Sequence, residues 1–242
     1  MVSDQDAQAG AGELSTAEFD AWYRGELDVV NEHASFEVDC VPWDIGAPQP
    51  ALVETERSGQ IRSEVLDIGC GPGDNALFLA DRGYRVVALD GAPTVIEQAR
   101  SRTQPGQNVE FAVGDATRLA GYEGWFSTVV DSALYHCLTE EQQADYLAAI
   151  HRATVPGAVL HLMCFSDAVP DAFPAPQKFS AEYLRESLAS HWDITSIERA
   201  QYITAFTAEN VARMTGHAAE SVDTDEQGRV LVPMWAVAAE RK

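Results

Sequence analysis

Between residues 64 and 165 the chain alternates between short apolar runs and amphipathic stretches, and this rhythm constrains the fold more than any other feature. The apolar runs have the length of buried strands, and the stretches between them have the period of helices. We predict strands at 65–68, 84–89, 109–113, 126–131 and 158–165, and helices at 75–82, 94–102 and 139–153. The last of these helices opens at Thr139 in a capping-box pattern. Strands and helices that alternate in this way form a parallel sheet covered by helices on both faces.

The segments on either side suggest three regions. Residues 1–14 are rich in Ala, Gly, Asp and Gln and predict a flexible tail. Residues 15–60 predict an N-terminal helical lid, with one helix that starts at Ser15 in a capping-box pattern and another near 50–57. Residues 61–242 predict the main domain, which ends with helix 180–189, strand 192–202, helix 207–218 and strand 230–240. Pro156 and Gly157 predict a turn before the fifth strand.

The charge of the chain limits its partners. It has 16 Lys and Arg against 38 Asp and Glu, which gives a formal net charge of −22 at pH 7. Because nucleic acids and anionic membranes are bound mainly through basic side chains, we expect neither as a partner. The N-terminal segment has no apolar stretch of the kind found in secretory signals, so the cytoplasm is the expected location. The four cysteines lack metal-site spacing, and no metal is expected.

A glycine loop follows the first predicted strand in the sequence VLDIGCGPG, residues 65–73. Glycines after a buried strand let the backbone turn sharply and approach a ligand. The dinucleotide fingerprint G-x-G-x-x-G, begun at Gly69, needs a small residue where Asp74 stands, although a start at Gly71 matches its looser form. Asp67 would repel a pyrophosphate beside it, but it would attract a ligand with an ammonium or sulfonium group. S-adenosylmethionine (SAM) carries both groups.

Carboxylates stand at the ends of four predicted strands. Asp90 follows Asp67 by 23 positions (90 − 67), where a carboxylate can accept hydrogen bonds from both ribose hydroxyls. Asp115 ends the third strand, in a position to accept from an adenine amino group, and Asp131 ends the fourth. A single acid of this kind can be a helix cap or a solvated loop residue. Four of them at one sheet edge, together with the glycine loop, predict a nucleoside site.

These motifs resemble those of a known family. The sequence VLDIGCGPGDNALFLADRGYRVVALD is similar to motifs I and II of class I SAM-dependent methyltransferases, and FAVGDA is similar to their third motif. The resemblance implies an α/β fold with a Rossmann-like, seven-stranded, mostly parallel sheet in the order 3-2-1-4-5-7-6, helices on both faces and an N-terminal lid. The upstream sequence PWDIG with Gln49 and Pro50 resembles a narrower branch of thiopurine-, halide- and thiol-methyltransferase-like enzymes and bacterial quinone or phenol methylators.

The resemblance also implies a set of residues that bind SAM. The glycines of the loop would approach its methionyl part, Asp90 its ribose, and Asp115 its adenine, while Trp43 would lie against it. The expected cofactor-binding residues are Trp43, Asp67, Gly69, Gly71, Gly73, Asp90, Gly91, Asp115, Ala116 and Asp131.

Methyl transfer from a sulfonium requires the protein mainly to align the donor with the acceptor and to exclude water, and a general base is optional. The catalytic candidates are His136 and Tyr135, after the fourth strand. The alternatives are a structural His136 bonded to backbone and a Tyr135 in the pocket wall. Asp131 would contact the amino-acid end of the donor or orient His136. The substrate pocket is expected to use Phe19, Trp22, Tyr23 and Phe165.

Together these features predict an enzyme that transfers the methyl group of SAM to O, S or N of a small, aromatic metabolite or natural product. A non-catalytic SAM-binding regulator or partner subunit is the alternative, and a dinucleotide-dependent oxidoreductase is the third interpretation. The pattern leaves the acceptor atom, the pathway and the oligomeric state open.

Overall fold

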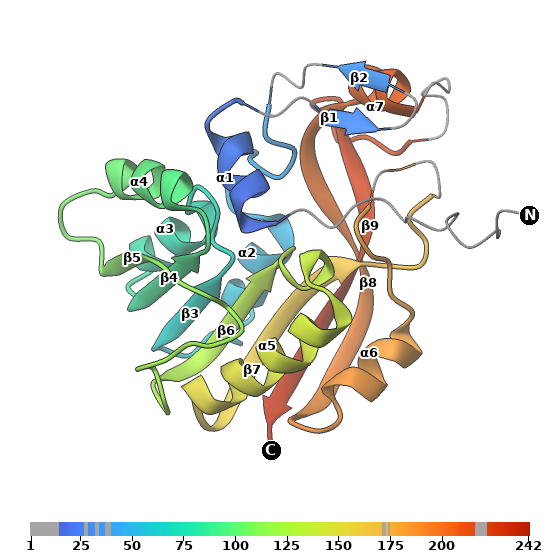
Figure 1. Cartoon of the computed structure of the whole chain (residues 1–242). Coiled ribbons are helices and arrows are strands. Elements are labelled where there is room, and N and C mark those ends of the chain that lie inside the picture. Colours follow the sequence, from blue (N-terminus) through green and yellow to red (C-terminus); the bar gives the residue numbers. More distant parts are fainter. Residues whose placement is uncertain are drawn as a thin grey trace, which may run out of the picture.

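The computed structural model describes residues 15–26, 29–31, 34–36, 40–170, 173, 175–215 and 222–242. The tail predicted at 1–14 lies outside these described residues. The centre of the protein is a seven-stranded sheet in the order β5-β4-β3-β6-β7-β9-β8 (Figure 1). Counted along the strands of this sheet, the order is 3-2-1-4-5-7-6, so the predicted fold class is confirmed. The pairs that β9 forms with β7 and β8 are antiparallel, and the other neighbouring pairs are parallel.

The predicted strands and helices are present, and most of their ends differ from the prediction by a few residues; the end of the helix predicted at 207–218 lies outside the described residues. The strands of the sheet are β3 (Val65–Ile68), β4 (Val86–Asp90), β5 (Val109–Val113), β6 (Phe126–Ser132), β7 (Thr154–Phe165), β8 (Trp192–Thr207) and β9 (Arg229–Arg241). The helices are α1 (Thr16–Tyr23), α2 (Pro50–Arg57), α3 (Asp74–Asp81), α4 (Pro93–Arg102), the 3₁₀ helix η1 (Tyr135–Cys137), α5 (Glu140–Ala153), α6 (Ala181–Leu188) and α7 (Ala208–Thr215). A small antiparallel pair, β1 (Val29–Asn31) and β2 (Ala34–Phe36), lies in the region for which only helices were predicted.

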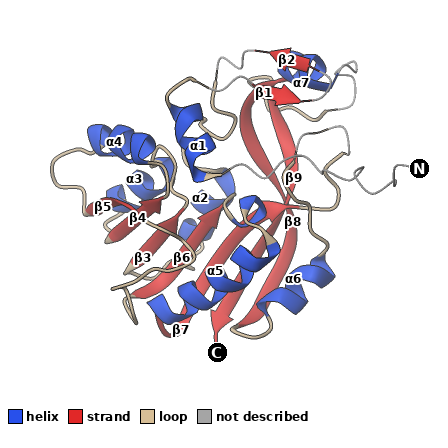
Figure 2. Cartoon of the chain, viewed as in Figure 1, coloured by secondary structure: helices blue, strands red, loops and turns tan. Residues whose placement is uncertain are grey.

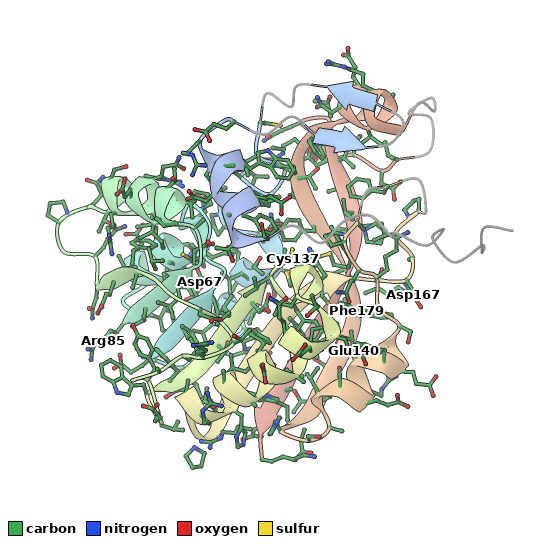
Figure 3. All side chains as sticks on the ribbon, in the orientation of Figure 1. Asp67, Arg85, Cys137, Glu140, Asp167 and Phe179 are labelled. Atoms are coloured by element: carbon green, nitrogen blue, oxygen red, sulfur yellow. The ribbon has the colours of Figure 1, made fainter. Side chains whose placement is uncertain are left out.

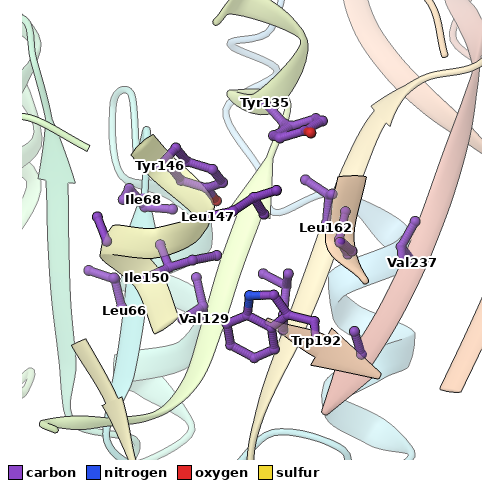
Figure 4. Close-up of a cluster of buried hydrophobic side chains, with 14 of the residues drawn as sticks. Leu66, Ile68, Val129, Tyr135, Tyr146, Leu147, Ile150, Leu162, Trp192 and Val237 are labelled. Atoms are coloured by element: carbon purple, nitrogen blue, oxygen red, sulfur yellow. The ribbon is translucent and has the colours of Figure 1, made fainter. Parts of the chain in front are cut away.

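Helices cover both faces of the sheet (Figure 2). Val65 belongs to a core cluster with side chains of α2, α3 and α4, whereas its neighbour Leu66 belongs to a second cluster with Ile150 of α5 and Leu184 of α6. Figure 4 shows the second of these clusters, in which Leu66 and Ile150 lie near Trp192. Adjacent residues of β3 are therefore buried on opposite faces, and all four residues of the strand are buried, including the charged residue Asp67.

Both predicted capping boxes are confirmed. The Ser15 side chain accepts a hydrogen bond from the Glu18 amide, and Glu18 binds back to Ser15, so α1 starts where the sequence indicated. The same reciprocal pair joins Thr139 and Gln142 at the start of α5. Each box satisfies backbone amides that the first helical turn leaves without partners.

The predicted turn at Pro156 and Gly157 is wrong. Both residues lie inside β7, where the pairing with β6 shifts register between Phe126 and Thr128. A bulge of this kind tolerates the missing amide of Pro156 and uses the positive φ of Gly157, which is 74°. β8 also continues to Thr207, beyond the predicted end at residue 202, and its pairing with β9 shifts register between Ile203 and Thr207. Within the described residues, no helix has the length and apolarity that crossing a membrane requires.

Candidate active site

The glycine loop between β3 and α3 adopts a backbone conformation that favours glycine. Gly69, Gly71 and Gly73 have φ angles of 71°, 51° and 88°. A Cβ at Gly69 would lie 2.7 Å from Leu134 Cβ, and a Cβ at Gly73 would lie 2.7 Å from the Phe111 ring. These two glycines are therefore required by packing inside the protein. Gly71 differs, because the nearest atoms to a Cβ there would be Tyr23 Oη at 3.3 Å and the Trp43 ring at 3.9 Å, which come from the segment above the loop.

Asp90, at the end of β4, holds the loop from the neighbouring strand. Its Oδ2 accepts a hydrogen bond from the Gly71 amide at 3.0 Å, and its Oδ1 accepts one from the Ala92 amide at 2.9 Å. Burial raises the pKa of Asp90, and these amides oppose that shift. A Cβ at Gly91 would lie 2.8 Å from the Thr16 side chain, so the start of α1 covers this strand end.

Asp67 in β3 has an orphaned carboxylate oxygen. Its side chain is 1% exposed, and Oδ2 has no hydrogen-bond partner among the described residues (Asp67 is labelled in Figure 3). Burial raises the pKa of Asp67 to about 7, and the charge of Asp131 adds to this effect. A buried carboxylate without a partner is costly, so a cation bound beside it would be stabilised. The ammonium group of SAM fits this requirement.

An aromatic cluster lies over the loop. The rings of Phe19, Trp22 and Tyr23 contact the Trp43 ring at centroid distances of 5.6, 5.2 and 6.1 Å. Trp43 Nε1 donates a hydrogen bond to Tyr23 Oη at 2.7 Å, and a Cβ at Gly71 would lie 3.3 Å from that oxygen. The structure thus brings the predicted pocket residues of α1 together with Trp43, above Gly71.

A cavity of about 40 Å³ lies between this cluster and the loop. Its lining residues are Trp43, Ala47, Gln49, Gly69, Cys70, Gly71, Pro72, Asp74, Asn75, Ser132 and Tyr202. Sites for small molecules usually measure ~300–1,000 Å³. The cavity is therefore too small for a whole nucleoside while α1 and Trp43 stay in this position.

Asp115 lies at the same edge of the sheet, because Val113 at the end of β5 pairs with Asp90. It is exposed, and its Oδ1 accepts hydrogen bonds from the amide and hydroxyl of Thr117 at 2.9 and 2.6 Å. The neighbouring Ala116 is half-buried and packs against the core beneath α5. Contact of Asp115 and Ala116 with adenine stays a prediction.

The Asp131 carboxylate, near the end of β6, is hydrogen-bonded to other residues of the protein through both oxygens. Its Oδ1 accepts hydrogen bonds from the amides of Leu134 and Tyr135 at 2.9 and 3.3 Å, and its Oδ2 accepts one from the Tyr146 hydroxyl at 2.7 Å. Burial raises the pKa of Asp131 to about 7, against the effect of these donors. None of these donors belongs to His136. The geometry therefore favours a third role for Asp131, which is to hold the turn after β6.

His136 in η1 is buried against Phe165. The two rings stack at 3.9 Å between centroids, and His136 Nδ1 accepts a hydrogen bond from the Phe165 amide at 3.3 Å. Burial lowers the pKa of His136 to about 3. A general base needs a free lone pair and a pKa near the working pH. Of the two roles left open for His136, the geometry favours the histidine bonded to backbone.

Tyr135, the other catalytic candidate, lies in the core. Its side chain is fully buried near Tyr146 (Figure 4). Its ring centroid lies 5.9 Å from that of Tyr146 and 5.3 Å from that of Phe179. Burial raises the pKa of this phenol. The geometry favours neither a catalytic phenol nor a pocket wall for Tyr135, but a packing role under α5.

Sequence reasoning missed Gln49, Ser132 and Tyr202, which line the cavity. Gln49 precedes Pro50 in the upstream sequence noted above, and Ser132 follows Asp131 at a strand end, so both positions carried a signal. Tyr202 lies in β8, far along the chain from the glycine loop and outside any motif. Its place at the site depends on the order of the strands.

Comparisons with known proteins identify the family of the chain. Residues 65–157 match the family model described as a methyltransferase domain. The chain is 38% identical over 163 residues to the 2-heptyl-1-hydroxyquinolin-4(1H)-one methyltransferase of Mycobacteroides abscessus, a match that covers 66% of this chain and 72% of the relative.

Solved structures extend the similarity over nearly the whole chain. One, described under the conversion of a disulfide bond into a thioacetal group during echinomycin biosynthesis, has a TM-score of 0.75 and 36% identity, and the match covers 94% of this chain and 93% of the other. The Burkholderia thailandensis 1,6-didemethyltoxoflavin-N1-methyltransferase, solved with bound 1,6-didemethyltoxoflavin and S-adenosylhomocysteine, shares the fold with a TM-score of 0.56 and 21% identity, over 80% of this chain and 77% of the other. By these similarities and by its sheet order, the chain belongs to the class I SAM-dependent methyltransferases.

Proposed function

We propose that this enzyme methylates an oxygen, sulfur or nitrogen atom of a planar, largely apolar small molecule. The observation that carries the proposal is the wall beside the cavity, where Tyr202 clusters with Met163 and Met234, and where Trp43 and Phe165 pack against them. Such a wall suits a flat aromatic acceptor. The relative from Mycobacteroides abscessus is named for a hydroxyquinolinone acceptor, which supports this class.

In this proposal the edge of the sheet holds the cofactor. Asp67 would receive the ammonium group, and Asp90, whose oxygens keep acceptor capacity beside the two amides, would bind the ribose hydroxyls. Asp115 and Ala116 would contact the adenine, and Trp43 would lie against the bound molecule. When bound, SAM supplies a methyl group on a sulfonium, and the carbon–sulfur bond breaks, with its electrons left on sulfur, as the bond to the acceptor forms.

Residues 15–60 would act as the lid and residues 61–242 as the cofactor-binding domain. The small cavity supports this division, because α1 and Trp43 have to move before a nucleoside can reach the loop. Closure would then exclude water and align the acceptor with the methyl group, and such positioning is worth ~7–11 kcal/mol. Neutral His136, stacked on Phe165, would form part of the wall.

We also propose a small-molecule partner and a cytoplasmic location. The net charge of −22 opposes the binding of nucleic acids. None of the four cysteines, which are all among the described residues, forms a disulfide, as expected in a reducing compartment.

The test is methyl transfer from radiolabelled SAM to a panel of acceptors. The panel contains 2-heptyl-1-hydroxyquinolin-4(1H)-one, a phenol, an aromatic thiol, an aromatic amine and iodide. We expect label in an aromatic product, with Asp90→Ala enzyme as the background. Binding of SAM without transfer to any acceptor would support the non-catalytic regulator and contradict the proposal.

A further inference from the structure

The Tyr202 side chain reaches the cavity from a strand at the edge of the sheet. It belongs to β8 at the sheet edge, yet it lines the same cavity as Gly69 and Gly71, which follow β3. Its side chain is 6% exposed and packs with Met163 and Met234. A phenol that projects from one edge of the sheet to the glycine loop can contact a molecule bound in this cavity.

The backbone at Tyr202 is fixed by the segment that leads into α2. The Gln49 side chain forms two hydrogen bonds with the backbone of Ile203, since Nε2 donates to the carbonyl at 2.9 Å and Oε1 accepts from the amide at 3.1 Å. Gln49 is 3% exposed, and its own amide donates to Asn75 Oδ1 at 3.2 Å. These bonds tie β8 to the start of α3 and hold the position of the neighbouring Tyr202.

Ser132 supplies a second hydroxyl opposite Tyr202. It is the last residue of β6, and both side chains line the cavity. The Ser132 hydroxyl oxygen is buried and finds no hydrogen-bond partner among the described residues. It still lowers the pKa of Tyr202, so the two groups are close without meeting in hydrogen-bonding geometry. A buried hydroxyl without a partner is costly, and a polar atom between the two would satisfy it.

The environment keeps Tyr202 protonated. Burial raises the pKa of its phenol, the carboxyls of Asp67 and Asp131 and the thiol of Cys137 add to the rise, and Ser132 opposes it. At neutral pH the phenol is therefore a hydrogen-bond donor. It is a poor general base for the same reason.

We propose that Tyr202 is a residue that contacts the acceptor, and that it donates a hydrogen bond to an oxygen of the acceptor while Ser132 binds the same polar group. This inference rests on the proposed function and extends it, because it selects planar acceptors whose reacting atom is, or adjoins, an oxygen that ionises. An oxyanion has several lone pairs, so one can accept from Tyr202 while another attacks the methyl carbon. The proton leaves the acceptor for solvent before the lid closes.

The variant that tests the inference is Tyr202→Phe, with Tyr122→Phe as the matched control. Tyr122 is half-buried and packs on Trp125 and Phe126, away from the cavity. The acceptor is 2-heptyl-1-hydroxyquinolin-4(1H)-one. We expect Tyr202→Phe to lower kcat/KM for it by about 10- to 100-fold, mainly through KM, with SAM affinity unchanged. We expect Ser132→Ala to give a smaller loss in the same direction.

A second readout separates contact from packing. If Tyr202 stabilises the anion of the bound acceptor, the acid limb of kcat against pH, measured with both substrates saturating, moves upward by about one pH unit in Tyr202→Phe and stays in place in Tyr122→Phe. Wild-type activity with equal kcat/KM and an unmoved limb in Tyr202→Phe would overturn this inference alone. No methylation by the wild type of any acceptor in the panel would overturn the proposed function, and the inference with it.

Discussion

Asp20 of α1 accepts a hydrogen bond from the backbone amide of Thr94, the second residue of α4, at 2.8 Å. The N-cap residue of α4 is Ala92, whose side chain cannot accept this bond. A carboxylate from α1, which belongs to the proposed lid, therefore caps α4 and also complements its dipole. The same hydrogen bond therefore holds α1 against α4 and caps α4.

Asp20→Ala should loosen the lid. Loss of a cap costs about 1 kcal/mol, or roughly 2–4 °C in melting temperature for a chain of this size. Dissociation of SAM, followed by stopped-flow fluorescence of the lid tryptophans, should become several-fold faster. The control is Glu26→Ala, because Glu26 is exposed and pairs with Arg24 at 2.9 Å. Equal dissociation rates in wild type and Asp20→Ala would show that α1 does not gate the site.

Affinity for SAM should rise with pH because of Asp67. With its pKa raised to about 7, the free protein holds this group largely protonated below neutrality, whereas the ammonium of SAM needs the carboxylate. Binding therefore releases a proton at low pH, and the dissociation constant should fall by about 10-fold between pH 6 and pH 8.

In Asp67→Asn the affinity for SAM should be weak and no longer depend on pH over this range. Asp81→Asn, a surface change near the end of α3, should keep the wild-type dependence. Titration calorimetry in buffers of different ionisation enthalpy measures both affinity and proton release. A flat wild-type profile would exclude Asp67 as the partner of the ammonium group.

Gly71→Ala should block the site while leaving the fold intact. Both Gly71 and Gly59 have positive φ, 51° and 73°, so either substitution costs about 1–2 kcal/mol in backbone strain. A Cβ at Gly59 meets nothing within 4 Å, whereas one at Gly71 would meet Tyr23 and Trp43. We expect similar melting temperatures for the two variants and a loss of SAM affinity, at least about 10-fold, in Gly71→Ala alone. Equal affinities would mean that the cofactor does not approach Gly71.

His136→Asn should keep the shape of the pH–rate profile. Asn can accept from the Phe165 amide in place of Nδ1, and the lost stacking should lower kcat by a few-fold at most. If His136 were the general base, the substitution would instead remove the acid limb and lower kcat by ~10²–10⁴-fold. Steady-state kinetics from pH 5 to pH 9 separate these results.

Local chemistry made much of the fold predictable. β5 has the predicted ends, and α1 and α5 begin after the predicted capping residues, because these features depend on neighbouring residues. Pro156 and Gly157 misled the prediction because their effect depends on the pairing of β7 with β6. The ribbon of β1 and β2 was missed for a similar reason, since strands this short are set by pairing more than by pattern.

Some residues of the candidate site could likewise be predicted from local sequence patterns, and others could not. Gly71, Asp67 and Asp90 lie in or just after the ends of predicted strands, and the structure brings them to one edge of the sheet as expected. The roles of Asp131 and His136 depend on partners that fold over them, Tyr146 and Phe165, which no local pattern identifies. Tyr202 reaches the cavity only because β8 lies beside β9 in the sheet.

The most direct test of the account is the affinity of Asp90→Ala for SAM, measured by titration calorimetry beside wild type and Asp81→Ala. Asp90 holds Gly71 and is proposed to bind the ribose, so its loss should reduce affinity by at least about 100-fold while the melting temperature without ligand shows a folded protein. Wild-type affinity in a folded Asp90→Ala protein would contradict the placement of the cofactor at this edge of the sheet.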